Sequence, residues 1–186
     1  LLARYEKNIF SVMEEVCASD DERVDLVIFL NGIAIMSFEL KCNAAGQSYQ
    51  DAIYQYRVDR DPNTRLFCFK AGCLVNFAMD LEQVYMTTKL AGNSTFFLPF
   101  NMGNGEGVNA GAGNPTFKDK YSVSYMCEDI LKKDTVLDLI SKFIFIETKE
   151  SKDELTGKTK KSENIIFPRY HQLDVIRKLL ADVREN

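Results

Sequence analysis

The sequence predicts an α/β fold in which helices flank a mixed central β-sheet. Two β-rich apolar runs, residues 24–30 and 33–41, are separated by Asn31-Gly32, the strongest short signal for a β-hairpin. Both runs are apolar almost throughout, which indicates that both faces of the hairpin are covered, as in the centre of a sheet.

Further elements follow from hydrophobic spacing, capping residues and turn residues. Ser48 with Asp51 three residues later is typical of a capping box and opens a helix that runs to about Arg60 and ends before Pro62. The other predicted helices cover residues 4–16, Glu128–Phe143 with a break near Asp134, and the segment from about His171; the other predicted strands are Leu66–Phe69, Leu74–Met79 and Val84–Leu90. Asn101–Pro115 reads as a Gly/Asn-rich loop.

Three charged residues stand at one end of the hairpin: Asp25 on its first strand, and Glu39 and Lys41 on its second. Glu39 and Lys41 share a face because side chains alternate along a strand. A two-residue turn at Asn31-Gly32 would put Asp25 on the opposite face, whereas a three-residue connection shifts the alternation and gathers all three. We expect this second register because it separates the polar set Asp25, Ser37, Glu39 and Lys41 from a wholly apolar set, Val24, Leu26, Ile28, Leu30, Ala34, Met36, Phe38 and Leu40.

Two carboxylates and a lysine at one place suit the hydrolysis of phosphodiester bonds. The reaction needs the phosphate charge screened, a hydroxide near neutral pH and a stabilised leaving oxygen, and a carboxylate-bound Mg²⁺ supplies all three. Mg²⁺ prefers one or two carboxylates with waters and phosphate oxygens, so Asp25, Glu39 and the backbone carbonyl of Leu40 are the candidate ligands. Lys41 would orient the attacking water and offset developing charge. On spacing alone, an inert arrangement in which these residues are solvated strand ends is the commoner one, because D…ExK often occurs by chance.

Composition and charge are those of an ordinary globular protein. The net charge of −4 argues against a general basic nucleic-acid binder, although a metal site is itself acidic before its cation binds. No apolar run approaches the roughly 20 residues needed to span a bilayer, and no secretion signal is recognisable. The five cysteines form no CxxC pair, so we interpret them as buried or half-buried thiols in a reducing cytoplasm. The chain begins without Met, so we expect it to be part of a longer protein.

The hairpin and several later stretches resemble one known family. Val-Asp-Leu-Val-Ile-Phe-Leu-Asn-Gly-Ile at 24–33 and Phe-Glu-Leu-Lys at 38–41 resemble the PD-(D/E)xK nuclease core of the R subunit of type I restriction-modification enzymes. Residues 51–62, 84–92, 97–101, 111–115 and 166–174 also resemble stretches of that subunit. The resemblance implies a restriction-endonuclease-like fold and the activity of a type I site-specific deoxyribonuclease, an endonuclease that is ATP-dependent in the full-length complex.

The resemblance also assigns roles to the charged corner. The family's metal-binding carboxylates fall on Asp25 and Glu39, and its catalytic lysine falls on Lys41. Val24 stands in place of the Pro that names the motif, and Ala34 stands where the family often has Pro; neither position supplies a ligand. An acidic residue on the first helix often approaches the metal in such folds, and the candidates are Glu6, Glu14 and Glu15.

A QxxxY element on the helix after the core is a further family feature. Register with Ala52 puts its glutamine at Gln55, although Asp59 then occupies the position of the tyrosine. Gln50 and Tyr54 also form this pattern, in a poorer register. We expect Gln55 to face the scissile phosphate or a metal-bound water.

The resemblance implies three segments and several partners. Residues 1–147 would form the nuclease domain, 148–164 a flexible linker, and 165–186 the truncated start of an ATP-dependent translocase domain. Gln172 resembles the glutamine that reads adenine there, so ATP is expected to act only in the full-length enzyme. The implied partners are double-stranded DNA and the methyltransferase and specificity subunits, with no membrane.

Two functions remain open at this point. The first is a Mg²⁺-dependent endonuclease module that cuts double-stranded DNA. The second is a catalytically inert nuclease fold that docks DNA or the motor domains. Metal binding that depends on Glu39 distinguishes them.

Overall fold

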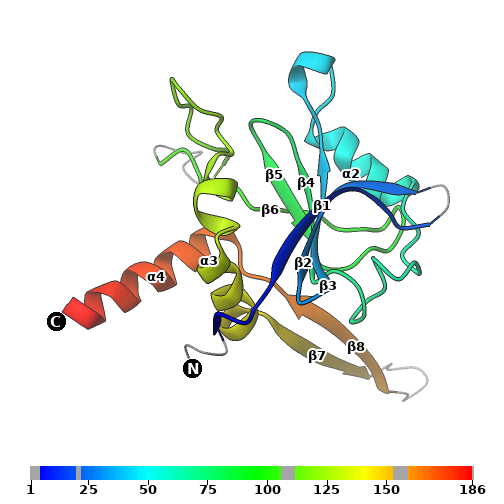
Figure 1. The fold of residues 1–186 in the computed structure, drawn as a ribbon. Helices are drawn as coiled ribbons and strands as arrows, with labels where there is room; N and C mark the ends of the chain where they lie inside the picture. Colours follow the sequence, from blue (N-terminus) through cyan, green and yellow to red (C-terminus); the bar gives the residue numbers. More distant parts are fainter. Residues whose placement is uncertain (1–4, 20–21, 106–111, 153–158, 186) are drawn as a thin grey trace.

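The fold was obtained as a computed structural model, which describes residues 5–19, 22–105, 112–152 and 159–185. A mixed sheet of six strands, in the order β1-β2-β3-β4-β5-β6, forms its centre, and β7 and β8 form a separate pair. Figure 1 shows α2 on one side of the sheet and α3 with the start of α4 on the other. The α/β class expected from the sequence is confirmed.

The strands of the sheet are β1 (Phe10–Cys17), β2 (Arg23–Leu30), β3 (Ile33–Leu40), β4 (Val75–Met79), β5 (Val84–Thr87) and β6 (Leu98–Pro99). Neighbouring strands are antiparallel except β3 and β4, which are parallel. The helices are α2 (Tyr49–Val58), α3 (Lys133–Asp138) and α4 (Tyr170–Glu185), with a 3₁₀ turn at Asn43–Ala45 and π-helical turns at Met126–Ile130 and Leu139–Phe143. The helix expected over Glu128–Phe143 is thus confirmed, and its break lies at Leu131–Lys132, two residues before Asp134.

Both faces of the sheet are covered, as the apolar hairpin indicated. On one face the core contains Phe38, Phe77 and Phe100 together with Phe167 and Leu173 from the C-terminal segment. On the other face Val27 and Ala78 pack against Ala52 and Tyr56 of α2. The hairpin is therefore held between two hydrophobic layers.

The N-terminal segment is a strand, so the helix predicted over residues 4–16 is wrong. β1 pairs with β2 along its length, and the backbone N–H of Asn31 donates to the carbonyl of Ile9 at 2.8 Å. Met13, Glu14 and Glu15 favour a helix locally, but β2 would otherwise present an unpaired edge. Pairing with that edge overrides the local preference.

The central hairpin does not have the predicted three-residue connection. The predicted result, Asp25 and Glu39 on one face of the sheet, is nevertheless found. Leu30 pairs with Ile33 across a two-residue turn in which Asn31 and Gly32 both have positive φ, 52° and 81°. The register then shifts by one residue, because Ile28 pairs with Met36 while Phe29 pairs with Ala34. Ile35 is the extra residue of a β-bulge.

The bulge changes which side chains share a face. With Leu26 opposite Phe38, the register continues to place Asp25 opposite Glu39, on the same face. The predicted separation into a polar and a wholly apolar face is only partly correct. Val24 and Ala34 belong to the core layer under α2 rather than to the layer that contains Phe38.

α2 begins as the sequence predicts. The Ser48 hydroxyl accepts the N–H of Gln50 at 3.3 Å, and the Asp51 carboxylate accepts the Ser48 N–H at 2.7 Å, which completes the capping box. The strands expected over Leu74–Met79 and Val84–Leu90 are found as β4 and the shorter β5.

Residues 66–69 do not form the expected strand. They lie in a series of turns, in which the Phe67 and Cys68 N–H groups both donate to the Thr64 carbonyl. The Phe67 ring packs edge-on against Tyr56, with the ring centroids 6.0 Å apart. The apolar character of this stretch therefore reflects contact with α2 and not sheet formation.

The flexible linker expected at 148–164 is replaced by paired strands wherever the structure describes it. β7 (Phe145–Lys152) and β8 (Thr159–Ile166) form an antiparallel ribbon. The Thr88 hydroxyl donates to the Ile165 carbonyl at 2.8 Å, which fixes the base of the ribbon to the loop after β5. The prediction was wrong because a ribbon with mostly exposed side chains needs few apolar residues, so its sequence is as polar as that of a linker.

α4 begins at Tyr170, close to the predicted start, and Phe167 before it and Leu173 within it both enter the core. Among the described residues no helix is both long and apolar enough to cross a bilayer. All five cysteines are free, but Cys17, Cys42 and Cys127 are exposed rather than buried or half-buried as expected.

The positive φ of Gly32 gives a first prediction. A Cβ on Gly32 would have no atom within 4 Å, so alanine would fit sterically and meet only the strain of the left-handed backbone. Gly32→Ala should lower the free energy of unfolding by about 1 kcal/mol in urea denaturation. Gly32→Asn is the control and should lose less, because Asn tolerates this conformation better. Equal losses would contradict the left-handed turn.

Candidate functional site

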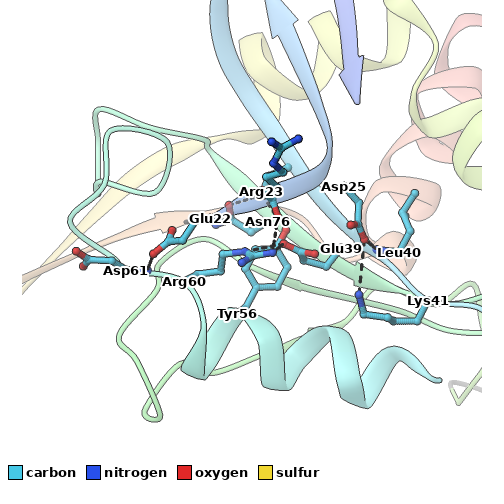
Figure 2. A network of polar contacts seen from close by, with 11 residues as sticks. Glu22, Arg23, Asp25, Glu39, Leu40, Lys41, Tyr56, Arg60, Asp61 and Asn76 are labelled. Atoms are coloured by element: carbon cyan, nitrogen blue, oxygen red, sulfur yellow. Dashed lines mark hydrogen bonds and ion pairs between the residues drawn. The ribbon is translucent and has the colours of Figure 1, made fainter. Parts of the chain in front are cut away.

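Asp25, Leu40 and Lys41 meet at one end of the β2–β3 hairpin (Figure 2). The Leu40 backbone N–H donates to Asp25 Oδ2 at 2.7 Å, and Lys41 Nζ lies 3.7 Å from the same oxygen. The Asp25 side chain is 29% exposed and that of Lys41 is 11% exposed. Asp25 is thus held from β3, at the end of the hairpin where solvent can still reach it.

Glu39 lies between this pair and Arg60 (Figure 2). Its side chain is fully buried, and Arg60 Nε and Nη2 both lie 2.8 Å from Glu39 Oε1. Burial raises the pKa of the Glu39 carboxyl from 4.5 to about 7, although Arg60 acts to lower it and Asp25 to raise it. Glu39 is therefore a carboxyl that exchanges its proton near neutral pH.

A hydrogen-bonded layer lies beside Glu39 on the same face. Ser37 donates its hydroxyl proton to Asn76 Oδ1 at 2.7 Å, so the Tyr56 hydroxyl, 2.8 Å away, donates to Ser37. Burial raises the pKa of Tyr56 well above its usual value of 10, so the phenol stays protonated. This layer joins β3, β4 and α2 around the carboxylate.

One oxygen of Glu39 is not satisfied by the protein. Oε2 is buried and accepts no hydrogen bond from the described residues, while Oε1 is held by Arg60. A buried carboxylate oxygen without a donor is rare in folded proteins because its desolvation is uncompensated. The oxygen therefore remains a buried acceptor without a donor among the described residues.

The donor atoms available here fit Mg²⁺. Asp25 and Glu39 provide two hard carboxylate oxygen donors, and the described residues hold no group of three or more His, Cys, Asp or Glu side chains that could hold a metal ion by itself, so water and substrate oxygens would have to complete the shell. Mg²⁺ typically takes one or two carboxylates and completes its shell with water and phosphate oxygens. The contribution of the Leu40 carbonyl to this set stays a prediction.

The two candidate glutamines, Gln55 and Gln50, have different surroundings in the structure. Gln55 is half-buried on α2, directly before Tyr56, and its amide forms no hydrogen bond with the described residues. Gln50 and Tyr54 are exposed and line a hollow of about 600 Å³ between α2 and the β5 side of the sheet, together with Arg57, Tyr85 and Phe97. Neither Gln50 nor Gln55 forms a hydrogen bond with Asp25, Glu39 or Lys41 in the described part of the chain, so both QxxxY registers stay predictions.

The acidic residues expected on a first helix lie on or beside β1 instead. Glu6, Glu14 and Glu15 are all exposed. Continuing the β1–β2 register puts Glu15 across from Asp25, with a positive φ of 50°. No ion pair or hydrogen bond joins Glu15 to Asp25 in the described part of the chain.

Gln172 has a structural contact of its own. Its side-chain oxygen accepts the backbone N–H of Arg169 at 2.9 Å, which caps the start of α4. Gln172 also lines a cleft of about 610 Å³ between the edge of the sheet and the β7–β8 ribbon. Its contact with a nucleotide stays a prediction.

Sequence reasoning missed Arg60. The signal that could have found it is the cost of burying Glu39, which requires a cationic partner somewhere in the fold. Arg60 lies two residues beyond the end of α2 at Val58, on the side of the sheet that α2 covers. Nothing in the local sequence shows that this side faces the end of β3.

A mixed sheet flanked by helices, with an acidic corner at the end of its central hairpin, defines a restriction-endonuclease-like α/β domain. The chain belongs to the family described as "Type I restriction enzyme R protein N terminus (HSDR_N)", which matches residues 3–95, half of the 186 residues. This confirms the resemblance found in the sequence.

A curated relative agrees with the family. The chain is 28% identical over 185 residues to the "Putative type I restriction enzyme MjaVIIIP endonuclease subunit" of Methanocaldococcus jannaschii. The match covers 93% of this chain but only 15% of that protein, so the chain spans a small part of its relative's length. No solved structure matches the chain.

The environment of Glu39 gives a second prediction. Infrared difference spectra should show one carboxyl that becomes protonated as the pH falls through about 7, well above the usual carboxyl range. Glu39→Gln should remove that signal and leave the other carboxyl bands. Persistence of the signal in Glu39→Gln would assign it to another residue.

Proposed function

We propose that this domain is the Mg²⁺-dependent endonuclease module of a type I restriction enzyme R subunit, hydrolysing phosphodiester bonds of double-stranded DNA. One observation carries the proposal. Asp25 lies opposite Glu39 across the β2–β3 pair and contacts Lys41, and a buried oxygen of Glu39 has no partner among the described residues. Membership of the R protein family supports the same activity.

The residues present would divide the work as follows. Asp25 and Glu39 would hold the cation between β2 and β3, and the Leu40 N–H keeps Asp25 in place from the opposite strand. When bound, Mg²⁺ would screen the phosphate, lower the pKa of water and stabilise the leaving oxygen. The hydrophobic layers on both faces keep the strand ends rigid, which favours a preorganised site.

Lys41 and Gln55 would act on the substrate side of the site. Lys41 is nearly buried beside Asp25, so its ammonium is directed to the Asp25 carboxylate rather than to bulk water. In that position it would orient the attacking water and offset negative charge at the phosphate. Gln55, half-buried on α2 with its amide available, would hold a phosphate oxygen or a water.

The complete enzyme would add what this domain lacks. The relative is named as an endonuclease subunit and is much longer than this chain. We propose that DNA, the methyltransferase and specificity subunits, and an ATP-driven translocase act with the domain in the cytoplasm. In that longer protein Gln172 would contact the nucleotide.

The catalytic assignment gives a third prediction. In the full-length R protein assembled with its partner subunits, Asp25→Asn, Glu39→Gln and Lys41→Met should each lower DNA cleavage by at least about 100-fold. Cleavage is measured on supercoiled plasmid with ATP and Mg²⁺, and ATP hydrolysis is followed in the same samples. ATP hydrolysis should persist, because the motor does not use these residues.

Matched controls come from exposed ion pairs elsewhere in the domain. Glu150 and Lys161 form a surface pair on the β7–β8 ribbon, and Asp138 pairs with Lys142. Glu150→Gln, Lys161→Met and Asp138→Asn make the same chemical changes away from the site and should cleave normally. Cleavage that survives any of the three site variants would refute the assignment.

Metal binding gives a fourth prediction and separates the enzyme from an inert scaffold. Calorimetric titration of the full-length protein with Mn²⁺, in the presence of a DNA duplex, should show binding that Glu39→Gln abolishes and Glu150→Gln preserves. Binding that is equal in wild type and Glu39→Gln, or absent in wild type, would favour a nuclease fold that only docks DNA or the motor.

A further inference from the structure

Arg60 lies outside the Asp25 and Glu39–Lys41 motif, yet it is the only described residue that bonds the Glu39 carboxylate. We propose that Arg60 is a positioning residue for the metal site: it holds Glu39 Oε1 so that Oε2 is the oxygen presented to the cation. The proposal rests on the proposed function, because it concerns the cation that the endonuclease would use.

The contact is specific to one carboxylate oxygen. Arg60 Nε donates to Glu39 Oε1 at 2.8 Å, and Nη2 lies 2.8 Å from the same atom. Both guanidinium contacts thus converge on Oε1, while Oε2 is buried without a donor among the described residues. A guanidinium that only neutralised the charge would more often engage both oxygens in a parallel fork.

Arg60 is itself fixed from several directions. Its Nη2 also donates to the carbonyl of Arg23 at 2.6 Å, at the first residue of β2. The next residue is tied as well, because the Asp61 N–H donates to Glu22 Oε1 at 3.1 Å. The side chain is 5% exposed, so the guanidinium has little freedom to move.

These anchors connect the two strands that supply the carboxylates. Arg60 bonds Glu39 near the end of β3 and Arg23 at the start of β2, two residues before Asp25. Figure 2 shows Arg60 reaching Glu39 from the side opposite to Asp25 and Lys41. The guanidinium therefore fixes the rotation of the Glu39 carboxylate while the Asp25 side remains open.

A positioning role has a measurable signature that a purely structural role lacks. Residues that orient metal ligands typically change metal affinity or activity by roughly 10–100-fold when they are replaced. Loss of orientation should raise the Mg²⁺ concentration needed for half-maximal cleavage, whereas the rate at saturating Mg²⁺ should recover. Loss of fold would lower the saturating rate and leave that concentration unchanged.

The test measures cleavage by the assembled full-length enzyme as a function of Mg²⁺ concentration. Arg60→Gln should raise the half-maximal Mg²⁺ concentration by at least about tenfold, and Arg60→Lys, which retains a charged donor, by less. Mn²⁺ titration calorimetry should show the same order of affinities. Arg57→Gln is the matched control: Arg57 lies in the last turn of α2, three residues before Arg60, but donates to the Thr95 carbonyl, at 3.1 and 3.0 Å, and not to the site.

Each outcome supports or overturns the proposal. An unchanged or lower half-maximal Mg²⁺ concentration in both Arg60 variants overturns it, and a lower one would show that Arg60 competes with the cation. If Arg60→Gln does not fold, Arg60→Lys with its full charge still decides between these results. Failure of the proposed function looks different, because Glu39→Gln would then bind Mn²⁺ and cleave DNA as well as wild type does.

Discussion

The burial of the Glu39 carboxylate is the constraint on which the surrounding structure depends. Removing a charge from water costs several kcal/mol, and within the described protein the direct bond that offsets this cost comes from Arg60. Arg60 can form it only if α2 lies along the sheet, which the contacts of α2 through Ala52 and Tyr56 ensure. The packing of α2 against the sheet therefore also places the cation that stabilises the buried Glu39 carboxylate.

The polar contacts around Glu39 are distributed unequally between its two oxygens. Arg60 bonds one of them, whereas Ser37 bonds Tyr56 and Asn76, and Asn76 Nδ2 donates to the Thr87 carbonyl. None of these three described side chains can move onto the second oxygen without breaking a bond of its own. The unpaired oxygen is therefore built into the fold and is not a consequence of loose packing.

Local signals explain what could be predicted from the sequence. The Asn31-Gly32 turn, the Ser48–Asp51 capping box and the Glu39-x-Lys41 spacing each act within a few residues, and the structure contains them. β1 could not be predicted, because residues 10–17 take their conformation from the edge of β2. The contact of Arg60 with Glu39 could not be predicted either, because it depends on where the end of α2 lies relative to β3.

The bulge at Ile35 gives this hairpin an odd count of residues between its two acidic positions. A strand reverses the direction of every following side chain when a single residue is gained or lost. An insertion or deletion between Asp25 and Glu39 would therefore turn one acid into the opposite hydrophobic layer, while most exchanges at constant length would not. The number of residues in this segment therefore decides which layer each acid enters.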